Sequence, residues 1–518
     1  MAIERVPAGN DYVIIDRCAG TGNLEKGLTD EELAHCILST VEYYEYKVMQ
    51  EILGSKVRHI IPPVEAADTF QAGLVKGADA LSKEYIENPI IKQYLDNPKC
   101  TIILFENPPY AETTSAEHQR SKVSKKSSTW KNSYVVGEMK KQLKGTVTND
   151  LGNAFIWSGF EYYLRQPTDS YVVYSPVKYW KAQHLVNKKF IAGLGFNRRW
   201  FHTNIDACVM VVFWANEDAQ LDNFQIDGYD WDPKTDKLVG VGMLDVKRVY
   251  TNVSKIYYDK RTISDADRNG ILCGLNGLEK FDGVRRNKPA YNANLIGYMV
   301  THSSGFDNPD LDSSLLVGGR YDGNGFYLRK DNYLEKMPLF AMSRYITYNR
   351  EWTERARIMK SGDGADQFNA DVASGKLDQW LLKCLLFTCV EMQNHMRTFT
   401  GSDGRFYRNE LCMDTTNGET VASNDLKRLI CGNAEQRIID QWETLLTAAK
   451  QTKEYNPALT YGVYQIFAEI DTFYKDEDGN TVWNNLEVHS ALQTLKTLVK
   501  DYYNTAIVPT LFEYEFLK

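Results

Sequence analysis

The size, composition and charge of this chain exclude several classes of protein. Its 518 residues are too many for one ordinary hydrophobic core, so we expect two or three domains. With 43% hydrophobic and 25% charged residues the chain is globular rather than disordered, and no apolar run is long enough to span a bilayer. A net charge of −8 does not favour nucleic-acid binding over the whole surface, although a local basic cleft can serve in an acidic protein.

The N-terminus and the cysteines point to a reducing compartment. The first residues lack the pattern of a signal peptide, so we expect a soluble, cytoplasmic protein. Nine cysteines are scattered along the chain without a CxxC pair. Buried reduced thiols are therefore expected, and we assign no metal site.

The chain up to residue 216 alternates apolar runs with helical patterns. Strands that are apolar throughout, separated by helices, predict an α/β fold of the Rossmann-like kind, with a mostly parallel sheet covered on both faces. We expect strands at residues 12–16, 35–42, 57–61, 101–105, 170–175 and 207–215, and a helix at residues 150–166.

The rest of the chain divides by composition. Residues 217–375 are rich in Gly, Asn, Asp and Tyr and predict a mixed α+β region with short elements. Residues 376–518 have helical periodicity and predict a helical C-terminal region. The predicted organisation is therefore three regions, 1–216, 217–375 and 376–518.

A glycine-rich turn, "IIDRCAGTGNL", follows the first predicted strand. The strand ends at Asp16, and Gly20 and Gly22 permit a tight turn that brings the backbone close to a ligand. This arrangement holds nucleotide-like cofactors at the carboxyl edge of α/β sheets, although a purely structural turn is an equal alternative. The three-glycine spacing of a dinucleotide site is absent, which argues against NAD.

Acidic residues follow the second and third predicted strands. Glu42 can accept hydrogen bonds from two ribose hydroxyls, or it can serve as a carboxylate favoured by a helix dipole. Asp68 can accept a hydrogen bond from an adenine amino group, or it can cap a helix.

The fourth predicted strand ends in Asn107-Pro108-Pro109-Tyr110. Two consecutive prolines fix the backbone and cannot continue the strand's hydrogen bonding. The amide oxygen of Asn107 and the carbonyl of Pro108 can be held as two acceptors for an exocyclic amine, whose lone pair then becomes available for attack on a methyl group. Tyr110 offers a ring for stacking. A plain turn is the alternative, since turns favour Asn and Pro.

Together these stretches resemble the class I S-adenosylmethionine-dependent amino-methyltransferases of DNA, in particular the N6-adenine enzymes. "DRCAGTGNL" resembles the cofactor motif of that family and "FENPPY" its catalytic motif. The resemblance extends to about residue 216, and it implies a mostly parallel sheet of seven strands.

The resemblance also implies roles for individual residues. Glu42 would hold the ribose of S-adenosyl-L-methionine and Asp68 its adenine ring, while Asn107 would lie between the cofactor and the target amine. Tyr110 would stack on an adenine flipped out of double-stranded DNA. Phe201 best matches the aromatic residue that packs on the other face of that base; packing of Phe201 or its neighbour Trp200 in the core is an equal alternative. The methionine part of the cofactor would be surrounded by Asp16, Cys18, Ala19, Gly20, Thr21 and Gly22.

The order of the motifs resembles the gamma arrangement, in which target recognition follows the catalytic domain. Family members of this order usually carry a segment before the first strand that closes over the cofactor, whereas only residues 1–11 precede the first predicted strand here. A second polypeptide could supply that segment, the chain could be truncated, or the pocket could be more open.

Basic residues cluster in three stretches that could contact DNA. The clusters are interleaved with aromatic residues, as in segments that track phosphates and contact bases, although a solvated charged face is the commoner explanation. We assign DNA contacts to Lys125, Lys126, Arg285, Arg286, Arg350 and Arg355, and Arg344 lies in the same stretch as the last two.

The sequence therefore predicts a site-specific DNA adenine-N6 methyltransferase that acts by direct methyl transfer. Three alternatives stay open: an RNA or protein-glutamine amino-methyltransferase, N4-cytosine methylation, and a non-catalytic or partner-dependent DNA-binding subunit of a modification or restriction system.

Overall fold

The computed structural model describes residues 1–62, 78–109, 129–201, 204–257, 294–301, 313–316, 325–400 and 406–518. The chain forms two compact units. The first contains Met1–Arg248 and Glu351–Arg357, and the second contains Val249–Arg350 and Ile358–Lys518. The chain therefore passes from one unit to the other after residues 248, 350 and 357.

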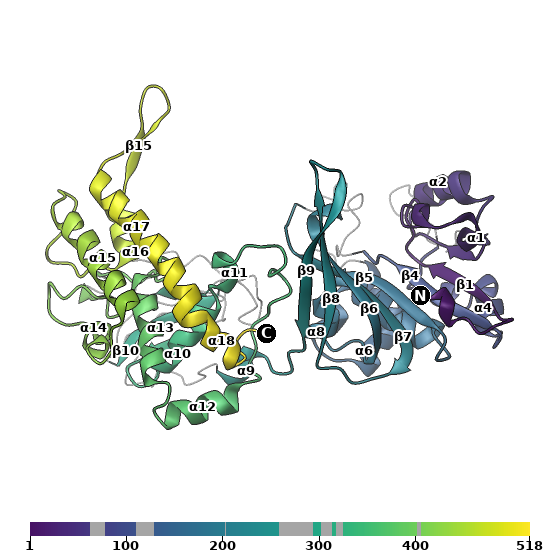
Figure 1. Ribbon diagram of the computed structural model, residues 1–518, viewed down its shortest axis with the longest axis horizontal. Helices are drawn as coiled ribbons and strands as arrows, with labels where there is room; N and C mark the ends of the chain where they lie inside the picture. The colour runs from purple at the N-terminus through teal and green to yellow at the C-terminus, as the bar shows by residue number, and fades with distance from the viewer. Residues whose placement is uncertain are drawn as a thin grey trace. The chain divides into compact units, whose positions relative to one another are not determined.

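A nine-stranded mixed sheet forms the centre of the first unit (Figure 1). The strand order is β3-β2-β1-β4-β5-β7-β6-β8-β9. Neighbours from β3 to β5 are parallel, β7 runs antiparallel to both β5 and β6, β8 is parallel to β6, and β9 is antiparallel to β8. The strands are β1 (Asp11–Asp16), β2 (Cys36–Leu38), β3 (His59–Ile60), β4 (Cys100–Glu106), β5 (Ser170–Pro176), β6 (Lys188–Asn197), β7 (Cys208–Asp218), β8 (Asn223–Asp232) and β9 (Lys237–Lys247).

Helices cover both faces of the parallel part of this sheet, as the apolar strands predict. Val13 and Ile15 of β1 belong to the larger core, together with residues of α6 and α7. Ile14, between them, belongs to the opposite core, which includes residues of α2. The helices are α1 (Asp30–Leu33), α2 (Tyr43–Leu53), α3 (Lys83–Ile86), α4 (Pro89–Leu95), α6 (Tyr134–Gln142), α7 (Leu151–Ser158) continued by the π-helical turn η5 (Gly159–Tyr163), and α8 (Lys178–Lys181).

Two expectations for this unit need correction. The sheet has nine strands where seven are expected, and the unit extends to Arg248 rather than to residue 216. The reason is the hairpin of β8 and β9, which adds to the edge of the sheet beside β6. Its residues alternate between exposed and buried in β8 and are mostly exposed in β9, so the hairpin lacks the apolar runs that mark the earlier strands.

A short segment from later in the chain also belongs to the first unit. Residues 351–357 pack beside the sheet, where the carbonyl of Arg355 accepts a hydrogen bond from the N–H of Cys208 (3.0 Å). A guanidinium N–H of Arg357 donates to the carbonyl of Asp245 (3.0 Å), and Trp352 packs against the larger core. This segment lies inside the region 217–375 of the sequence analysis, which the structure therefore divides between the two units.

The second unit is largely helical and has its own core. Its longer helices include α13, which is apolar on all sides and buried, as expected for the central helix of a helical core. The helices are α9 (Val253–Ile256), α10 (Tyr333–Met342), α11 (Tyr345–Tyr348), α12 (Ala365–Ala373), α13 (Asp378–Val390), α14 (Val421–Leu426), α15 (Asn433–Lys450), α16 (Val463–Glu469), α17 (Leu486–Tyr502), its π-helical continuation η9 (Tyr503–Ile507), and α18 (Val508–Glu513).

Short strands complete the second unit. An antiparallel sheet has the order β11-β10-β12, and two hairpins lie between helices. The hairpin of β15 and β16 projects from the end of α17 (Figure 1). The strands are β10 (Leu295–Thr301), β11 (Ser313–Leu316), β12 (Gly325–Arg329), β13 (Phe399–Thr400), β14 (Phe406–Tyr407), β15 (Phe473–Lys475) and β16 (Thr481–Trp483).

Within the part of the chain that the structure describes, none of the helices combines the length and the apolar character that crossing a membrane requires.

Candidate active site

The glycine turn and the Asn-Pro-Pro turn start from neighbouring strands at one edge of the sheet. β1 pairs in parallel with β4, with Ile15 opposite Leu104, so Asp16 and Glu106 end their strands side by side. From this pair the chain order runs outward in opposite directions, to β2 and β3 on one side and to β5 on the other. Such a switch point, at the carboxyl ends of the strands, is where open α/β sheets bind ligands.

A buried ion pair joins these two strand ends. The Nε–H of Arg17 donates to Oε1 of Glu106 (2.5 Å), and its Nη2 donates to Oε2 (2.8 Å), while both side chains are fully buried. The backbone N–H of Arg17 also donates to Oε1 of Glu106 (3.1 Å). The first residue after β1 is therefore bonded through side chain and backbone to the last residue of β4.

The same guanidinium reaches two further elements. It donates to the hydroxyl of Ser158 (2.8 Å) and to the carbonyl of Phe155 (2.7 Å), both in α7. The hydroxyl of Tyr171 in β5 donates to Oε2 of Glu106 (2.5 Å). Because a buried charge is stable only when it is paired and hydrogen-bonded, this network fixes the positions of β1, β4, β5 and α7 together. Neither Arg17 nor Glu106 is identified by the sequence analysis.

The glycine turn has the conformation expected of a ligand-binding loop. Gly20 and Gly22 adopt φ values of 58° and 77°, which favour glycine, and Oδ1 of Asp16 accepts the N–H of Cys18 (2.8 Å). The N–H of Ala19 donates to the carbonyl of Ser39, which follows β2 (2.9 Å). A Cβ added to Gly22 would lie 2.5 Å from Cδ1 of Leu53 in α2, so no larger residue fits there without a shift.

Beside this turn lies a carboxylate that the sequence analysis misses. Glu25 is 1% exposed, and neither of its carboxylate oxygens has a hydrogen-bond partner among the described residues. A Cβ on Gly22 would meet its Oε2 at 3.8 Å, so the Glu25 carboxylate borders the turn. Burial raises the pKa of Asp16 well above its usual value, and the nearby carboxylates of Glu25 and Glu106 raise it further.

Two glutamates follow β2. Glu42 precedes the first turn of α2 and is half-buried, so it lies after the strand end as predicted. Glu45, one turn into α2, lies nearer the glycine turn: its Oε2 accepts a hydrogen bond from the hydroxyl of Thr40 (2.5 Å) and would lie 4.0 Å from a Cβ on Gly20. The helical spacing of these two residues could have suggested Glu45 as an alternative to Glu42.

Asn107 carries an acceptor without a donor. Its amide oxygen is buried and has no hydrogen-bond partner among the described residues. Pro108 is buried, and a Cβ on Gly152 of α7 would lie 3.7 Å from the carbonyl oxygen of Pro109, so α7 supports the turn from one side. An orphaned acceptor of this kind costs free energy unless a ligand supplies a donor.

A row of aromatic rings leads from this strand end to Phe201. The ring of Phe105, in β4, lies 6.3 Å from that of Tyr174 in β5, which lies 5.9 Å from the ring of Phe201. Phe201 is half-buried, whereas Trp200 is largely exposed and donates its indole N–H to Asp230 of β8 (2.7 Å). Of the two candidates, Phe201 is therefore the one that belongs to the aromatic row.

Several predicted site residues lie outside the described residues, and their roles stay predictions. They are Asp68, Tyr110, Lys125, Lys126, Arg285 and Arg286.

The structure separates the two arginines predicted in the later basic stretch. Arg350 belongs to the second unit, where it is exposed and its Nε–H donates to the carbonyl of Thr347 (3.1 Å). Arg355 belongs to the first unit and is half-buried. Arg344, from the same stretch, is buried in an ion pair with Glu391 (3.1 Å), which holds α11 to the end of α13. The sequence cannot distinguish this structural arginine from an exposed one.

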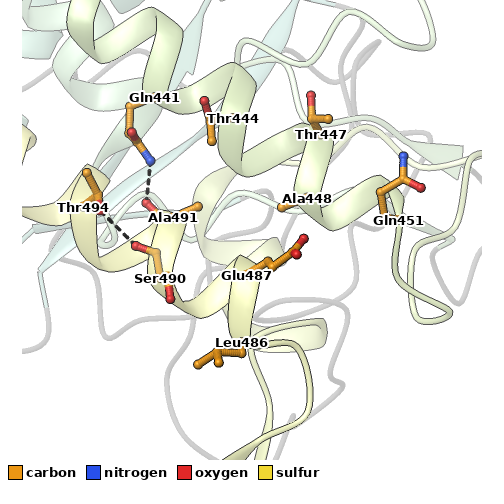
Figure 2. Close-up of a pocket in the computed structure, with 10 residues that line it drawn as sticks. All are labelled: Gln441, Thr444, Thr447, Ala448, Gln451, Leu486, Glu487, Ser490, Ala491 and Thr494. Carbon is orange, nitrogen blue, oxygen red and sulfur yellow. Dashed lines mark hydrogen bonds between the residues drawn. The ribbon is translucent and has the colours of Figure 1, made fainter.

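A hollow of another kind lies in the second unit, between α15 and α17 (Figure 2). Small and polar side chains line it, among them Thr444, Ser490 and Thr494, and Glu487 is its one charged lining residue. It brings together no acid–base pair or nucleophile, so the switch point of the sheet is the better candidate site. No group of three or more His, Cys, Asp or Glu side chains in the described ranges could hold a metal ion.

No protein-family model and no curated protein matches this chain. Among solved structures, the type IIG restriction endonuclease BpuSI is similar at 14% identity, covering 44% of this chain and 25% of that chain, with a TM-score of 0.28. A DrdV–DNA complex is similar at 14% identity, covering 67% and 35%, with a TM-score of 0.31. The type IIL restriction-modification enzyme MmeI in complex with DNA is similar at 11% identity, covering 98% and 72%, with a TM-score of 0.31. This chain spans a quarter to about a third of the length of the first two proteins. These TM-scores are too low to establish a shared fold.

The buried ion pair predicts a large effect on stability. Replacing Arg17 with Met leaves the Glu106 carboxylate buried without its cation, which should reduce the free energy of unfolding by about 3–5 kcal/mol in chemical denaturation. Arg5→Met is the matched control, because Arg5 pairs with Glu217 in a partly exposed position and should contribute about 1 kcal/mol or less. Equal effects of the two substitutions would contradict the structural role given to Arg17.

The glycine turn predicts a second difference between matched variants. Gly22→Ala and Gly9→Ala both place a side chain at positive φ, but only at Gly22 would the new Cβ meet another residue. Gly9→Ala should cost about 1 kcal/mol, and Gly22→Ala should cost more because Leu53 must move. Thermal unfolding of the two variants measures the difference, and a Gly22→Ala protein as stable as Gly9→Ala would show that Leu53 moves at no cost.

Proposed function

We propose that this chain is a site-specific DNA adenine-N6 methyltransferase that uses S-adenosyl-L-methionine. The observation that carries the proposal is the buried, unpartnered amide oxygen of Asn107, at a sheet edge where the neighbouring strand ends in a glycine turn. An adenine amine is a donor of the kind that this oxygen lacks.

The Asn107 turn supports a role in orienting the amine. With two N–H groups donated to the amide oxygen of Asn107 and the carbonyl of Pro108, the amine loses conjugation with its ring and its nitrogen lone pair becomes nucleophilic. The prolines at 108 and 109 hold these acceptors in place because their φ angles are fixed. Catalysis then comes from orientation and proximity rather than from a nucleophilic side chain.

The residues of the glycine turn fit the proposed cofactor. Gly20 and Gly22 leave room for a ligand next to the backbone, and the carboxylates of Glu25 and Glu45 border the two glycines. Glu45 or Glu42 can accept hydrogen bonds from ribose hydroxyls, as acids after the second strand do in such folds. When bound, S-adenosyl-L-methionine would supply an electrophilic methyl group.

DNA is the proposed substrate because an adenine amine in a duplex has to leave the stack to reach such a site. Phe201, at the end of the aromatic row, would then pack on one face of the flipped base. The second unit would contribute to recognition of the target sequence.

The test is to map modified bases in DNA from cells that express the chain and that otherwise lack adenine methylation. We expect N6-methyladenine within one short sequence motif. Asn107→Ala should reduce methylation by about two orders of magnitude, since it removes one of the two groups that orient the amine. Asn223→Ala, at the exposed start of β8, is the matched control and should leave methylation unchanged.

Purified protein separates the alternatives. The chain is incubated with S-adenosyl-L-methionine labelled in its methyl group and with DNA, RNA or protein as acceptor. Label in RNA or protein but not in DNA would overturn the proposed substrate class. Methylation that appears only after a cell extract is added would identify a partner-dependent subunit.

A further inference from the structure

Asp16 and Glu25 form a pair of buried carboxyl groups beside the glycine turn. Asp16 is 2% exposed and Glu25 is 1% exposed. The two carboxyls lie close enough for a hydrogen bond between them, but two ionised carboxylates have no hydrogen to donate. Both oxygens of Glu25 are therefore left without a partner unless a proton or a ligand provides one.

The charges around this pair do not balance it. Arg17 is the buried cation of the site, and its guanidinium is committed to Glu106. The other groups that face the pair are the thiols of Cys18 and Cys36 and the carboxylate of Glu106. Glu45 adds a further carboxylate on the far side of the glycine turn.

A shared proton relieves this excess of negative charge in the free protein. Burial raises the pKa of both Asp16 and Glu25, and for Asp16 the neighbouring carboxylates contribute in the same direction. Two interacting carboxyls of this kind titrate as a pair, and one of them keeps its proton above the usual carboxyl range.

We infer that Asp16 and Glu25 form an anionic subsite for an ammonium group of the ligand, and that the pair releases its shared proton when the ammonium group binds. The inference rests on the proposed function, because S-adenosyl-L-methionine carries an ammonium group on its methionine part. It adds Glu25 as a residue that selects the charge of the ligand.

An ammonium group suits the pair better than other cations do. It has three N–H donors, which match the two unpartnered oxygens of Glu25 and the carboxylate of Asp16. A sulfonium centre has no hydrogen to donate, so it would leave the oxygens of Glu25 unpartnered. A metal ion would need further ligands, and the described residues offer no cluster of three.

The experiment is calorimetric titration of the free protein with S-adenosylhomocysteine, which has the ammonium group and lacks the sulfonium. Titrations in two buffers that differ in ionisation enthalpy give the number of protons released, and a pH series gives the dependence of affinity on pH. On the acidic side of the pair's titration we expect about one proton released per ligand, with Kd falling about tenfold for each unit of rising pH. Above it the release should stop and Kd should level off.

Two comparisons isolate the subsite. The analogue of S-adenosylhomocysteine that lacks only the α-amino group should release no proton from the wild-type protein and should bind about tenfold to a hundredfold more weakly. Glu25→Gln should abolish the proton release and weaken binding of S-adenosylhomocysteine by a similar factor. Glu31→Gln, which neutralises an exposed glutamate of α1, is the matched control and should change neither quantity.

Thermal unfolding of the free protein gives a readout that needs no ligand. The folded state binds the shared proton more tightly than the unfolded state does, so stability should fall as pH rises above the usual carboxyl range. Glu25→Gln removes one of the two carboxyls and should raise Tm most at the higher pH. A lower Tm for this variant at every pH would indicate an ordinary packing role.

The outcomes separate this inference from the proposed function. If the wild-type protein binds neither S-adenosyl-L-methionine nor S-adenosylhomocysteine, the proposed cofactor is wrong. If it binds both, but the desamino analogue binds equally well and Glu25→Gln releases as many protons as the wild-type protein, the cofactor stands and the ammonium subsite is wrong.

Discussion

The ion pair between Arg17 and Glu106 is the constraint on which the rest of the candidate site depends. It joins the residue after β1 to the last residue of β4, so it sets the spacing between the glycine turn and Asn107. Both charges are fully buried, and such a pair is stable only when its remaining hydrogen-bonding groups are satisfied. Ser158, Phe155 and Tyr171 satisfy them, so any movement of one turn relative to the other would leave a charge unpaired.

The electrostatic balance of the site follows from that commitment. Because the only buried guanidinium described here serves Glu106, the carboxyls of Asp16 and Glu25 face each other without a cation. Such an arrangement makes the free protein less stable than it could be, and it turns that cost into selectivity for a ligand that brings a positive charge. Asn107 shows the same principle with a neutral group, since its buried oxygen lacks a donor.

The sequence predicts what local pattern and strand order determine. Apolar runs predict β1 and β4 to within a residue at each end, and parallel pairing then brings Asp16 and Asn107 to one edge. It cannot predict the pairing of Arg17 with Glu106, since 89 residues separate them and either could be a surface charge. Glu25 is missed for the same reason: only the fold shows that its carboxylate is buried. The hairpin of β8 and β9 is missed because its residues are largely exposed and carry no apolar run.

The three passages of the chain between the units have a consequence for how such proteins can be recombined. Residues 351–357 belong to the first unit, although the chain on either side of them belongs to the second. Neither unit is a continuous stretch of sequence, so a single junction cannot exchange one unit for that of a relative. A chimera joined at residue 248 would replace Trp352 and Arg357 together with the second unit, and the sheet would lose contacts that it makes with its own chain. Successful exchange would have to keep this seven-residue insert with the sheet and place junctions at all three passages.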